Sequence, residues 1–325
     1  MERTIVPATG PLLDEILALS HDIWGEGLSR DAYARFNRAQ AASSWGAAHL
    51  ERVALVTTDG TLLSTAKRYD LQARVDGRSV RVLGIGAVFT PPHQRRQRFA
   101  ADLIERLLDR ARGEGYEYAL LFSAIGSEYY RRLGFRAVPI AQVSFVVRQK
   151  PGAPAVNVRS GEDRDLRFLA EMHEARATTC GARFFLERDA DFIQFAISRK
   201  RMLAGLGPAN FRQLEYFVVD EGGRAVAYAV VLNTDGVRML TECGDRDPSG
   251  ARLGALLQAV LARTPREKSA PVRAWLPRGF RPPQIDIVDE ERPAVVMMIQ
   301  ALGSSAALLS PLEVGDVMYW LNDVM

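Results

Sequence analysis

The stretch that decides the fold covers residues 84–100 and reads Gly84-Ile85-Gly86-Ala87-Val88-Phe89-Thr90-Pro91-Pro92-His93-Gln94-Arg95-Arg96-Gln97-Arg98-Phe99-Ala100. It describes an apolar strand, a basic loop and the start of a helix. The first turn of a helix has unpaired N–H groups and a partial positive charge, so this order of elements forms a binding site for an anion. The arginines of the loop add positive charge. The ligand that suits such a site is a pyrophosphate, as in a nucleotide or coenzyme A.

Upstream of this stretch, extended apolar runs are separated by two Asp-Gly pairs, Asp59-Gly60 and Asp76-Gly77. Asp-Gly between such runs is a strong hairpin signal. Residues 53–57, 61–74 and 80–90 are therefore predicted to form an antiparallel meander. Two helices are expected before it, at residues 12–19 and 30–42.

Downstream, an amphipathic helix is predicted from Phe99 to the glycines at 113 and 115. Its apolar face consists of Leu103, Ile104, Leu107, Leu108 and Ala111. Residues 118–122 form a continuous apolar run, which is typical of a strand buried on both faces. A short helical stretch at 127–133 and extended runs at 137–142 and 144–147 complete the first half.

The second half repeats this order of elements after a predicted linker at residues 150–154, Lys-Pro-Gly-Ala-Pro. The pattern predicts helices at 163–177, 186–203 and 249–262, and strands at 216–220, 225–232, 237–243, 272–275 and 295–299. We interpret the recurrence as a structural repeat. The expected fold class is α/β (α+β), with two domains, residues 1–150 and 155–325, each a mixed, mostly antiparallel sheet flanked by helices.

The composition is that of a globular protein of about two domains, with 325 residues, 47% hydrophobic and 25% charged. A net charge of +3 argues against nucleic-acid binding by bulk charge. The two cysteines, Cys180 and Cys243, are too few for a disulfide framework and have no metal-binding spacing. No apolar stretch reaches the ~18 residues of a membrane span. We therefore expect a cytoplasmic protein with no metal, nucleic-acid or membrane partner, and we leave homo-oligomerisation open.

Residues 88–100 resemble the cofactor loop of the GNAT superfamily of acyl-CoA-dependent N-acyltransferases. The family's loop reads Arg/Gln-x-x-Gly-x-Gly/Ala after a strand of the type Val-x-Val/Thr. Here Val88-Phe89-Thr90 is followed by Arg95-x-x-Arg98-x-Ala100. Arg98 stands where the family has glycine. We expect this position to lie within the helix at negative φ, where a side chain is tolerated.

The resemblance implies acetyl-CoA as co-substrate. Backbone groups of Val88 and Thr90 would pair with the pantetheine arm, and N–H groups of residues 95–100 would hold the pyrophosphate. The implied cofactor-binding residues are Val88, Phe89, Thr90, Arg95, Arg96, Gln97, Arg98, Phe99, Ala100 and Ser123.

A second stretch, Tyr130-Arg131-Arg132-Leu133-Gly134-Phe135, resembles the family's Tyr-x-x-x-Gly-Phe/Tyr motif. The resemblance gives Tyr130 the role of protonating the departing CoA thiolate, which a phenol can do. Tyr129 is the fallback for this role. We interpret Gly134 as a requirement of the turn.

Two subfamilies share these features. The tandem arrangement and the strand at 84–90 resemble the Eis-like acetyltransferases, and Val-Phe-Thr-Pro-Pro with Leu-Phe-Ser-x-Ile-Gly is also similar to fungal lysine N-acetyltransferases. Both acylate primary amines, so the expected acceptor is a small-molecule, lysine-like or aminoglycoside-like amine. Eis-like proteins also have a sterol-carrier-like third domain and use their C-terminal carboxylate in catalysis. We expect little room for that domain in 325 residues and do not transfer the role to Met325.

Direct attack on the thioester needs a neutral amine, and hence a base or a water relay. Residues 82–86 carry no carboxylate. His21, Glu26, Asp70 and His93 are candidates, and we assign none of them.

The corresponding loop of the second half, residues 244–251, has Asp245 and Asp247 in place of the arginines. These acids would repel a pyrophosphate, so we expect a degenerate second site. The main hypothesis is an N-acetyltransferase whose amine attacks acetyl-CoA directly. The alternatives are a non-catalytic acyl-CoA sensor or interaction protein and transfer of a longer acyl chain.

Overall fold

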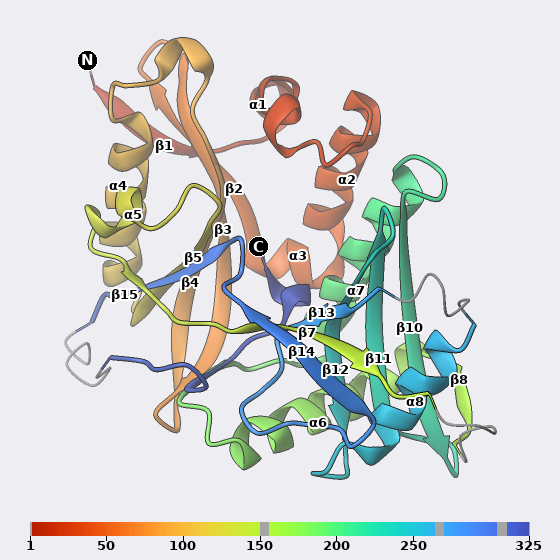
Figure 1. The fold of residues 1–325 in the computed structure, drawn as a ribbon. Helices are drawn as coiled ribbons and strands as arrows, with labels where there is room; N and C mark the ends of the chain where they lie inside the picture. Colours follow the sequence, from red (N-terminus) through yellow and green to blue (C-terminus); the bar gives the residue numbers. More distant parts are fainter. Residues whose placement is uncertain (1, 150–155, 264–269, 304–310, 325) are drawn as a thin grey trace. The chain divides into compact units, whose positions relative to one another are not determined.

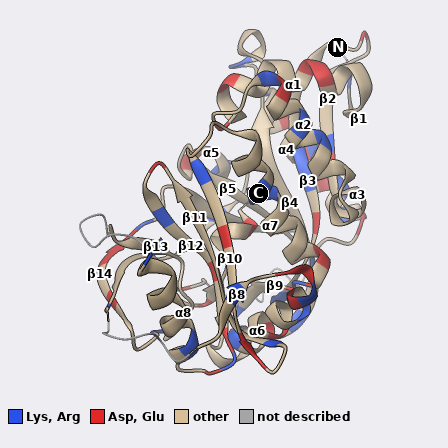
Figure 2. Ribbon diagram, turned by 90° about the vertical axis from the view of Figure 1, so that its right-hand side faces the viewer, with Lys and Arg blue, Asp and Glu red and all other residues tan. Residues whose placement is uncertain are grey.

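The computed structural model describes residues 2–149, 156–263, 270–303 and 311–324. The chain divides into two compact units (Figure 1). The first comprises Met1–Pro139 and Ala294–Pro311, and the second comprises Ile140–Pro293 and Leu312–Val324. Among the described residues, no helix combines the length and the apolar character that crossing a membrane requires. Acidic and basic residues are interspersed along the elements of both units (Figure 2), in keeping with the small net charge.

The first unit is a mixed sheet with helices on both faces. Its elements are β1 (Arg3–Pro7), α1 (Gly10–Trp24), α2 (Arg30–Ala42), α3 (Ser44–His49), β2 (Leu50–Thr57), β3 (Leu62–Val75), β4 (Arg78–Phe89), η1 (Pro92–Gln94), α4 (Phe99–Gly113), β5 (Tyr118–Ser123), α5 (Glu128–Arg131), β6 (Arg136–Ala137) and β15 (Val296–Ala301). The strand order is β1-β2-β3-β4-β5-β15-β6, in which β4 and β5 are parallel and the other pairs antiparallel.

The predicted meander and the helix after it are confirmed. Val75 pairs with Arg78, so Asp76 and Gly77 alone form the turn, and both have positive φ as a two-residue hairpin turn requires. The predicted apolar face of α4 is buried against the sheet. Its partners include Val53 and Leu55, whereas the intervening residues of β2 pack with α1. Because side chains alternate along a strand, α1 and α4 cover opposite faces.

The second unit has the same kind of layers. Its elements are β7 (Gln142–Val147), β8 (Val158–Ser160), η2 (Asp163–Asp165), α6 (Leu166–Thr179), β9 (Phe184–Leu186), α7 (Ala190–Leu206), β10 (Arg212–Glu221), β11 (Arg224–Thr234), β12 (Val237–Asp245), α8 (Ala251–Leu261), β13 (Val272–Ala274), β14 (Ile285–Glu291), β16 (Val317–Met318) and η5 (Leu321–Asp323). The strand order is β8-β10-β11-β12-β13-β7-β14, with β12 and β13 parallel. On β11, Ala227 and Ala229 pack in the apolar cluster of α8, and Tyr228 in that of α6 and α7.

The two sheets repeat each other and exchange one strand. Strand β15 lies between β5 and β6 in the first sheet, as β7 lies between β13 and β14 in the second. The expectation that 144–147 completes the first domain and 295–299 the second is therefore wrong for both strands. Both are short apolar runs, and such a pattern predicts a strand without naming its partner. The predicted linker, residues 150–154, lies outside the described residues.

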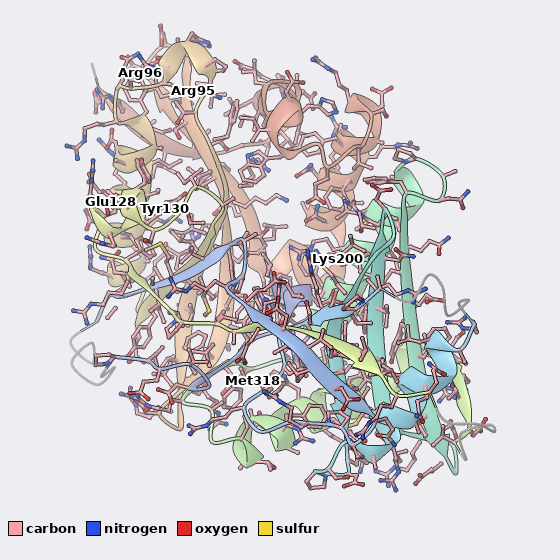
Figure 3. All side chains as sticks on the ribbon, in the orientation of Figure 1. Arg95, Arg96, Glu128, Tyr130, Lys200 and Met318 are labelled. Atoms are coloured by element: carbon pink, nitrogen blue, oxygen red, sulfur yellow. The ribbon has the colours of Figure 1, made fainter. Side chains whose placement is uncertain are left out.

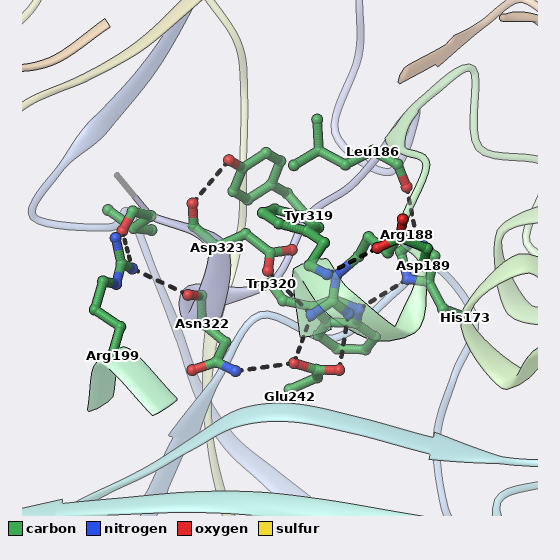
Figure 4. Close-up of polar contacts among 12 residues, drawn as sticks. His173, Leu186, Arg188, Asp189, Arg199, Glu242, Tyr319, Trp320, Asn322 and Asp323 are labelled. Atoms are coloured by element: carbon green, nitrogen blue, oxygen red, sulfur yellow. Dashed lines mark hydrogen bonds and ion pairs between the residues drawn. The ribbon is translucent and has the colours of Figure 1, made fainter. Parts of the chain in front are cut away.

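A buried ion-pair cluster anchors the C-terminal segment within the second unit (Figure 4). Arg188 donates to both carboxylate oxygens of Glu242 at 2.7 and 2.8 Å, and lies 3.1 Å from Asp323. The Asn322 amide donates to Glu242 at 3.0 Å, and Arg199 donates to the Asn322 carbonyl at 3.1 Å. All five side chains belong to buried residues.

His173 forms a second anchor of this segment. The Trp320 indole N–H donates to Nδ1 of His173 at 3.0 Å, and Nε2 of His173 lies 2.8 Å from the Leu186 carbonyl. Since an indole nitrogen only donates, Nδ1 accepts and the proton is on Nε2. Burial lowers the pKa of His173 to about 3, which keeps the ring neutral.

Candidate functional site

Strand β4 is bulged near its end. Gly86 lies opposite Lys67 and Phe89 opposite Thr65, so β4 carries one more residue than β3 between these pairs. Ala87 takes a φ of +46°, which marks the position of the bulge. A bulge bends a strand, and it turns the end of β4 away from its regular course.

The same end of β4 lies beyond its pairing with β5. The parallel ladder runs from Val82 opposite Tyr118 to Ile85 opposite Leu121. Residues 86–89 of β4 and 122–123 of β5 extend past it. The two strand ends diverge here, and their backbone amides suit an extended ligand arm that carries amide groups of its own.

Side-chain hydrogen bonds fix the residues that follow the bulge. The Ser64 hydroxyl of β3 donates to the Phe89 carbonyl at 3.0 Å and lies 3.1 Å from the Thr90 hydroxyl. Arg95 Nε donates to the Thr90 carbonyl at 3.2 Å. The sequence analysis missed Ser64, because a serine within an apolar strand gives no signal of a partner on the next strand.

The loop before α4 contains two arginines in the left-handed region, Arg96 at φ +64° and Arg98 at φ +63°. Arg98 is the residue that immediately precedes the helix. The expectation of negative φ within the helix is wrong for Arg98. The backbone here keeps the conformation that favours the family's glycine, and a side chain occupies it at a cost of about 1 to 2 kcal/mol.

The side chains of this loop point to solvent while the helix that follows is anchored in the core. Arg95, Arg96, Gln97 and Arg98 are exposed, Ala100 is half-buried, and Phe99 is buried in the α4 cluster (Figure 3). Arg98 is 81% exposed, and its ion pair with Glu105 is long, at 3.6 Å. The positive charges of Arg95, Arg96 and Arg98 thus lie near the N–H groups of the first turn of α4 and favour an anionic ligand.

Tyr130, on α5, packs in the same apolar cluster as Phe99, Leu121 and, more loosely, Val88. This cluster joins the ends of β4, β5 and α4 to α5. Burial, with a smaller contribution from Tyr129, raises the pKa of Tyr130 to about 12, so the hydroxyl keeps its proton at neutral pH. Among the described residues, none forms a hydrogen bond with this hydroxyl.

The turn after Tyr130 requires glycine. Gly134 has φ +90°, and a Cβ there would lie 2.8 Å from Nε2 of Gln300. The N–H groups of Leu133 and Phe135 both donate to the Tyr130 carbonyl, at 3.0 and 3.1 Å. The interpretation of Gly134 as a turn requirement is confirmed.

Ser123 ends β5 and is buried. Its hydroxyl donates to the Gly126 carbonyl at 2.5 Å, which closes the loop that leads to α5. The side chain therefore holds this loop, and a contact with the cofactor stays a prediction for Ser123.

Two of the four candidate bases, His21 and Asp70, hydrogen-bond to other residues. His21 Nε2 lies 2.8 Å from the Leu28 carbonyl, and Asp70 accepts from Arg81 at 3.0 Å. His93 is exposed on η1. In the part of the chain that the structure describes, no group of His, Cys, Asp and Glu residues forms a metal site.

In the second unit, the loop between β12 and α8 corresponds to the arginine loop, and a carboxylate of the protein itself lies at the start of its helix. Asp245, at the end of β12, accepts hydrogen bonds from the N–H groups of Leu253 in α8 and of Asp247, both at 2.8 Å. Gly250 precedes α8 with φ +73°, as Arg98 precedes α4. Burial raises the pKa of Asp245, but these two hydrogen bonds oppose that effect. A carboxylate at the helix start supports the expectation that this loop does not take a pyrophosphate.

Both the sequence and the fold are similar to those of known proteins. Residues 14–138 match the family model for an acetyltransferase (GNAT) domain. No curated protein matches the chain. Three similar solved structures are a GCN5-related N-acetyltransferase from Kribbella flavida (TM-score 0.65, 18% identity, covering 94% of this chain and 74% of that one), Eis1 from Mycobacterium abscessus (0.54, 13%, 94% and 75%) and N-myristoyltransferase from Saccharomyces cerevisiae with bound myristoyl-CoA (0.53, 11%, 92% and 82%).

At these identities the structures show that the tandem fold is shared along nearly the whole chain. The family model covers the meander, the arginine loop and the tyrosine motif together. Residues 14–138 therefore match an acetyltransferase (GNAT) domain, and the fold of nearly the whole chain is similar to that of a GCN5-related N-acetyltransferase and of Eis1.

Proposed function

We propose that this protein transfers an acetyl group from acetyl-CoA to a primary amine of a small molecule or a lysine-like side chain. The observation that carries the proposal is the divergence of β4 from β5 directly before the exposed arginine loop of α4. The first feature suits the amide-containing arm of CoA and the second its pyrophosphate.

In this proposal the chemistry takes place at the inner end of the donor. The amine nitrogen attacks the thioester carbonyl, the carbon–sulfur bond breaks, and the sulfur leaves as a thiolate. The nitrogen loses one proton to water or to a base that we do not assign. The Tyr130 hydroxyl donates a hydrogen bond to the leaving sulfur, and the thiolate takes up a proton from solvent.

The high pKa of Tyr130 defines how it assists. A thiol has a pKa of about 8.5, so complete proton transfer from a phenol with a pKa of about 12 is uphill. The hydroxyl therefore acts mainly as a hydrogen-bond donor while negative charge develops on the sulfur.

The cofactor loop is tested by reversing one of its charges. Arg95→Glu is expected to weaken acetyl-CoA binding about 10- to 100-fold, because it places an acid beside the pyrophosphate. Isothermal titration of the purified protein measures the affinity. Arg112→Glu, at the opposite end of α4, makes the same change of charge and should leave the affinity near that of the wild type. Equal affinities of all three proteins would refute the loop assignment.

The role of Tyr130 is tested by removing only its hydroxyl. Tyr130→Phe is expected to lower kcat for thiol release about 100-fold and to leave CoA affinity unchanged, with Tyr129→Phe as the matched control. The assay uses a panel of amines that includes free lysine, a lysine-containing peptide and an aminoglycoside. Wild-type turnover by Tyr130→Phe would remove this residue from the mechanism.

A non-catalytic acyl-CoA sensor is the second candidate. It is favoured by the lack of a carboxylate in residues 82–86 and by the structural partners of His21 and Asp70. Binding of CoA without thiol release on any amine of the panel would support it. The yeast neighbour holds a longer acyl-CoA, so donors from acetyl to myristoyl belong in the same assay.

A further inference from the structure

Ser64 is a buried hydroxyl that connects two strands at the divergent end of β4. Ser64 lies on β3 and is 0% exposed. Its Oγ donates to the Phe89 carbonyl at 3.0 Å and lies 3.1 Å from the Thr90 hydroxyl. A buried hydroxyl without such partners is costly, so these contacts fix its orientation. Ser64 thereby fixes the backbone of the residues that follow the bulge.

This end of β4 has few other restraints on its course. The ladder to β5 stops at Ile85, and the ladder to β3 is interrupted by the bulge after Gly86 and resumes only at Phe89, opposite Thr65. Beyond Phe89, the Thr90 carbonyl is held by Arg95, a residue of the exposed loop. Among the described side chains that hydrogen-bond to residues 89 and 90, Ser64 is a fully buried one, and it lies within β3.

We propose that Ser64 is a positioning residue for the acyl donor: through the Phe89 carbonyl and the Thr90 hydroxyl it fixes the backbone of residues 88–90, which receives the pantetheine arm. The inference rests on the proposed function and adds to it a residue that does not touch the donor itself. Its effect is confined to the arm of the donor and does not extend to the nucleotide.

The test compares two donors that share the arm, acetyl-CoA and acetyl-pantetheine, which lacks the nucleotide. Ser64→Ala is expected to raise KM for both donors by the same factor, about three- to tenfold, with kcat changed less than twofold. Arg96→Glu is the reference for the nucleotide end and should raise KM for acetyl-CoA alone.

The matched control is Thr65→Val on the same strand. Thr65 is equally buried, but its hydroxyl donates to the Val53 carbonyl of β2 at 2.7 Å and not to β4. Its loss should lower the melting temperature by an amount similar to that in Ser64→Ala and leave both KM values unchanged. Equal KM changes in the two variants, or a change confined to acetyl-CoA, would overturn the proposal.

A second variant tests the proposal in case Ser64→Ala folds poorly. Thr90→Val removes the other hydroxyl of the Ser64–Thr90 contact at a half-buried position, and it should raise both KM values by one common factor. Unchanged KM values in Thr90→Val would also count against the proposal. Wild-type protein that neither binds nor turns over either donor refutes the proposed function itself, whereas a normal wild type with a normal Ser64→Ala refutes only the role of Ser64.

Discussion

Arg98 combines two roles that oppose each other. Its backbone at φ +63° disfavours any side chain, whereas its guanidinium adds positive charge where an anion is expected. The loop pattern that this stretch resembles has glycine here, which adopts a positive φ without that strain. This chain keeps the left-handed conformation and accepts the strain of an arginine in it.

Arg98→Gly is expected to raise the free energy of unfolding by about 0.5 to 1 kcal/mol. The relief of strain exceeds the greater freedom that glycine gives the unfolded chain. Arg98→Ala is the control, because it removes the same charge and keeps the Cβ. Urea unfolding should show the glycine variant to be the more stable of the two by about 1 kcal/mol, and equal stabilities would contradict the strain.

At the scale of elements, the helices and hairpins were predictable because their signals are local. The apolar spacing of α4 and the Asp76-Gly77 turn each define one element from a few neighbouring residues. The sequence also placed the arginine loop and Tyr130 correctly in relation to β4 and β5. It did not predict the partner of Ser64 or the exchange of β7 and β15, since each depends on residues distant in the chain. It also did not predict the positive φ of Arg98, because an arginine gives no local signal for the left-handed conformation.

The 3-10 helix η5 contributes one of two buried carboxylates that contact the same cation. Asp323 and Glu242 share one guanidinium, that of Arg188. Glu242 has the bidentate contact and hydrogen bonds from Asn322 and Tyr228 as well, so it stays ionised. Burial, together with the charge of Glu242, raises the pKa of Asp323 to about 7 despite the opposing effects of Arg188 and Arg199.

Titration of Asp323 is expected to lower the stability of the protein as the pH rises from about 4 to about 7. The folded state holds this proton up to about pH 7, whereas the unfolded state releases it near pH 3.8, so rising pH favours unfolding through this window. Asp323→Asn carries no titrating group and should lose less stability over the same range. Urea unfolding of both proteins at each pH measures the difference, in which the contribution of His173 cancels. Parallel pH profiles would contradict the raised pKa.

At the scale of the whole molecule, the exchanged strands make each sheet depend on both halves of the sequence. Without β15, the edge of β5 carries open backbone groups beside an apolar face. Such an edge promotes aggregation. The unit that carries the candidate site is therefore discontinuous in sequence.

A fragment of residues 1–139 is expected to aggregate, and the same fragment joined through a Gly/Ser linker to residues 294–303 is expected to be a soluble, cooperatively folding protein. The difference is the strand β15, which completes the first sheet. Analytical ultracentrifugation and circular dichroism of both fragments measure the outcome. A soluble, folded 1–139 fragment without the added strand would show that β15 is dispensable.

The strand exchange also limits how this gene can change. Deletion of the second half of the chain would remove strand β15 from the first sheet. Selection on the first half thus preserves the second as well. The second loop, with Asp245 and Asp247, belongs to neither exchanged strand, so its residues can change without loss of a strand from either sheet. Because β15 completes the first sheet and β7 the second, neither half of the sequence can be lost without removing a strand from the other half's sheet.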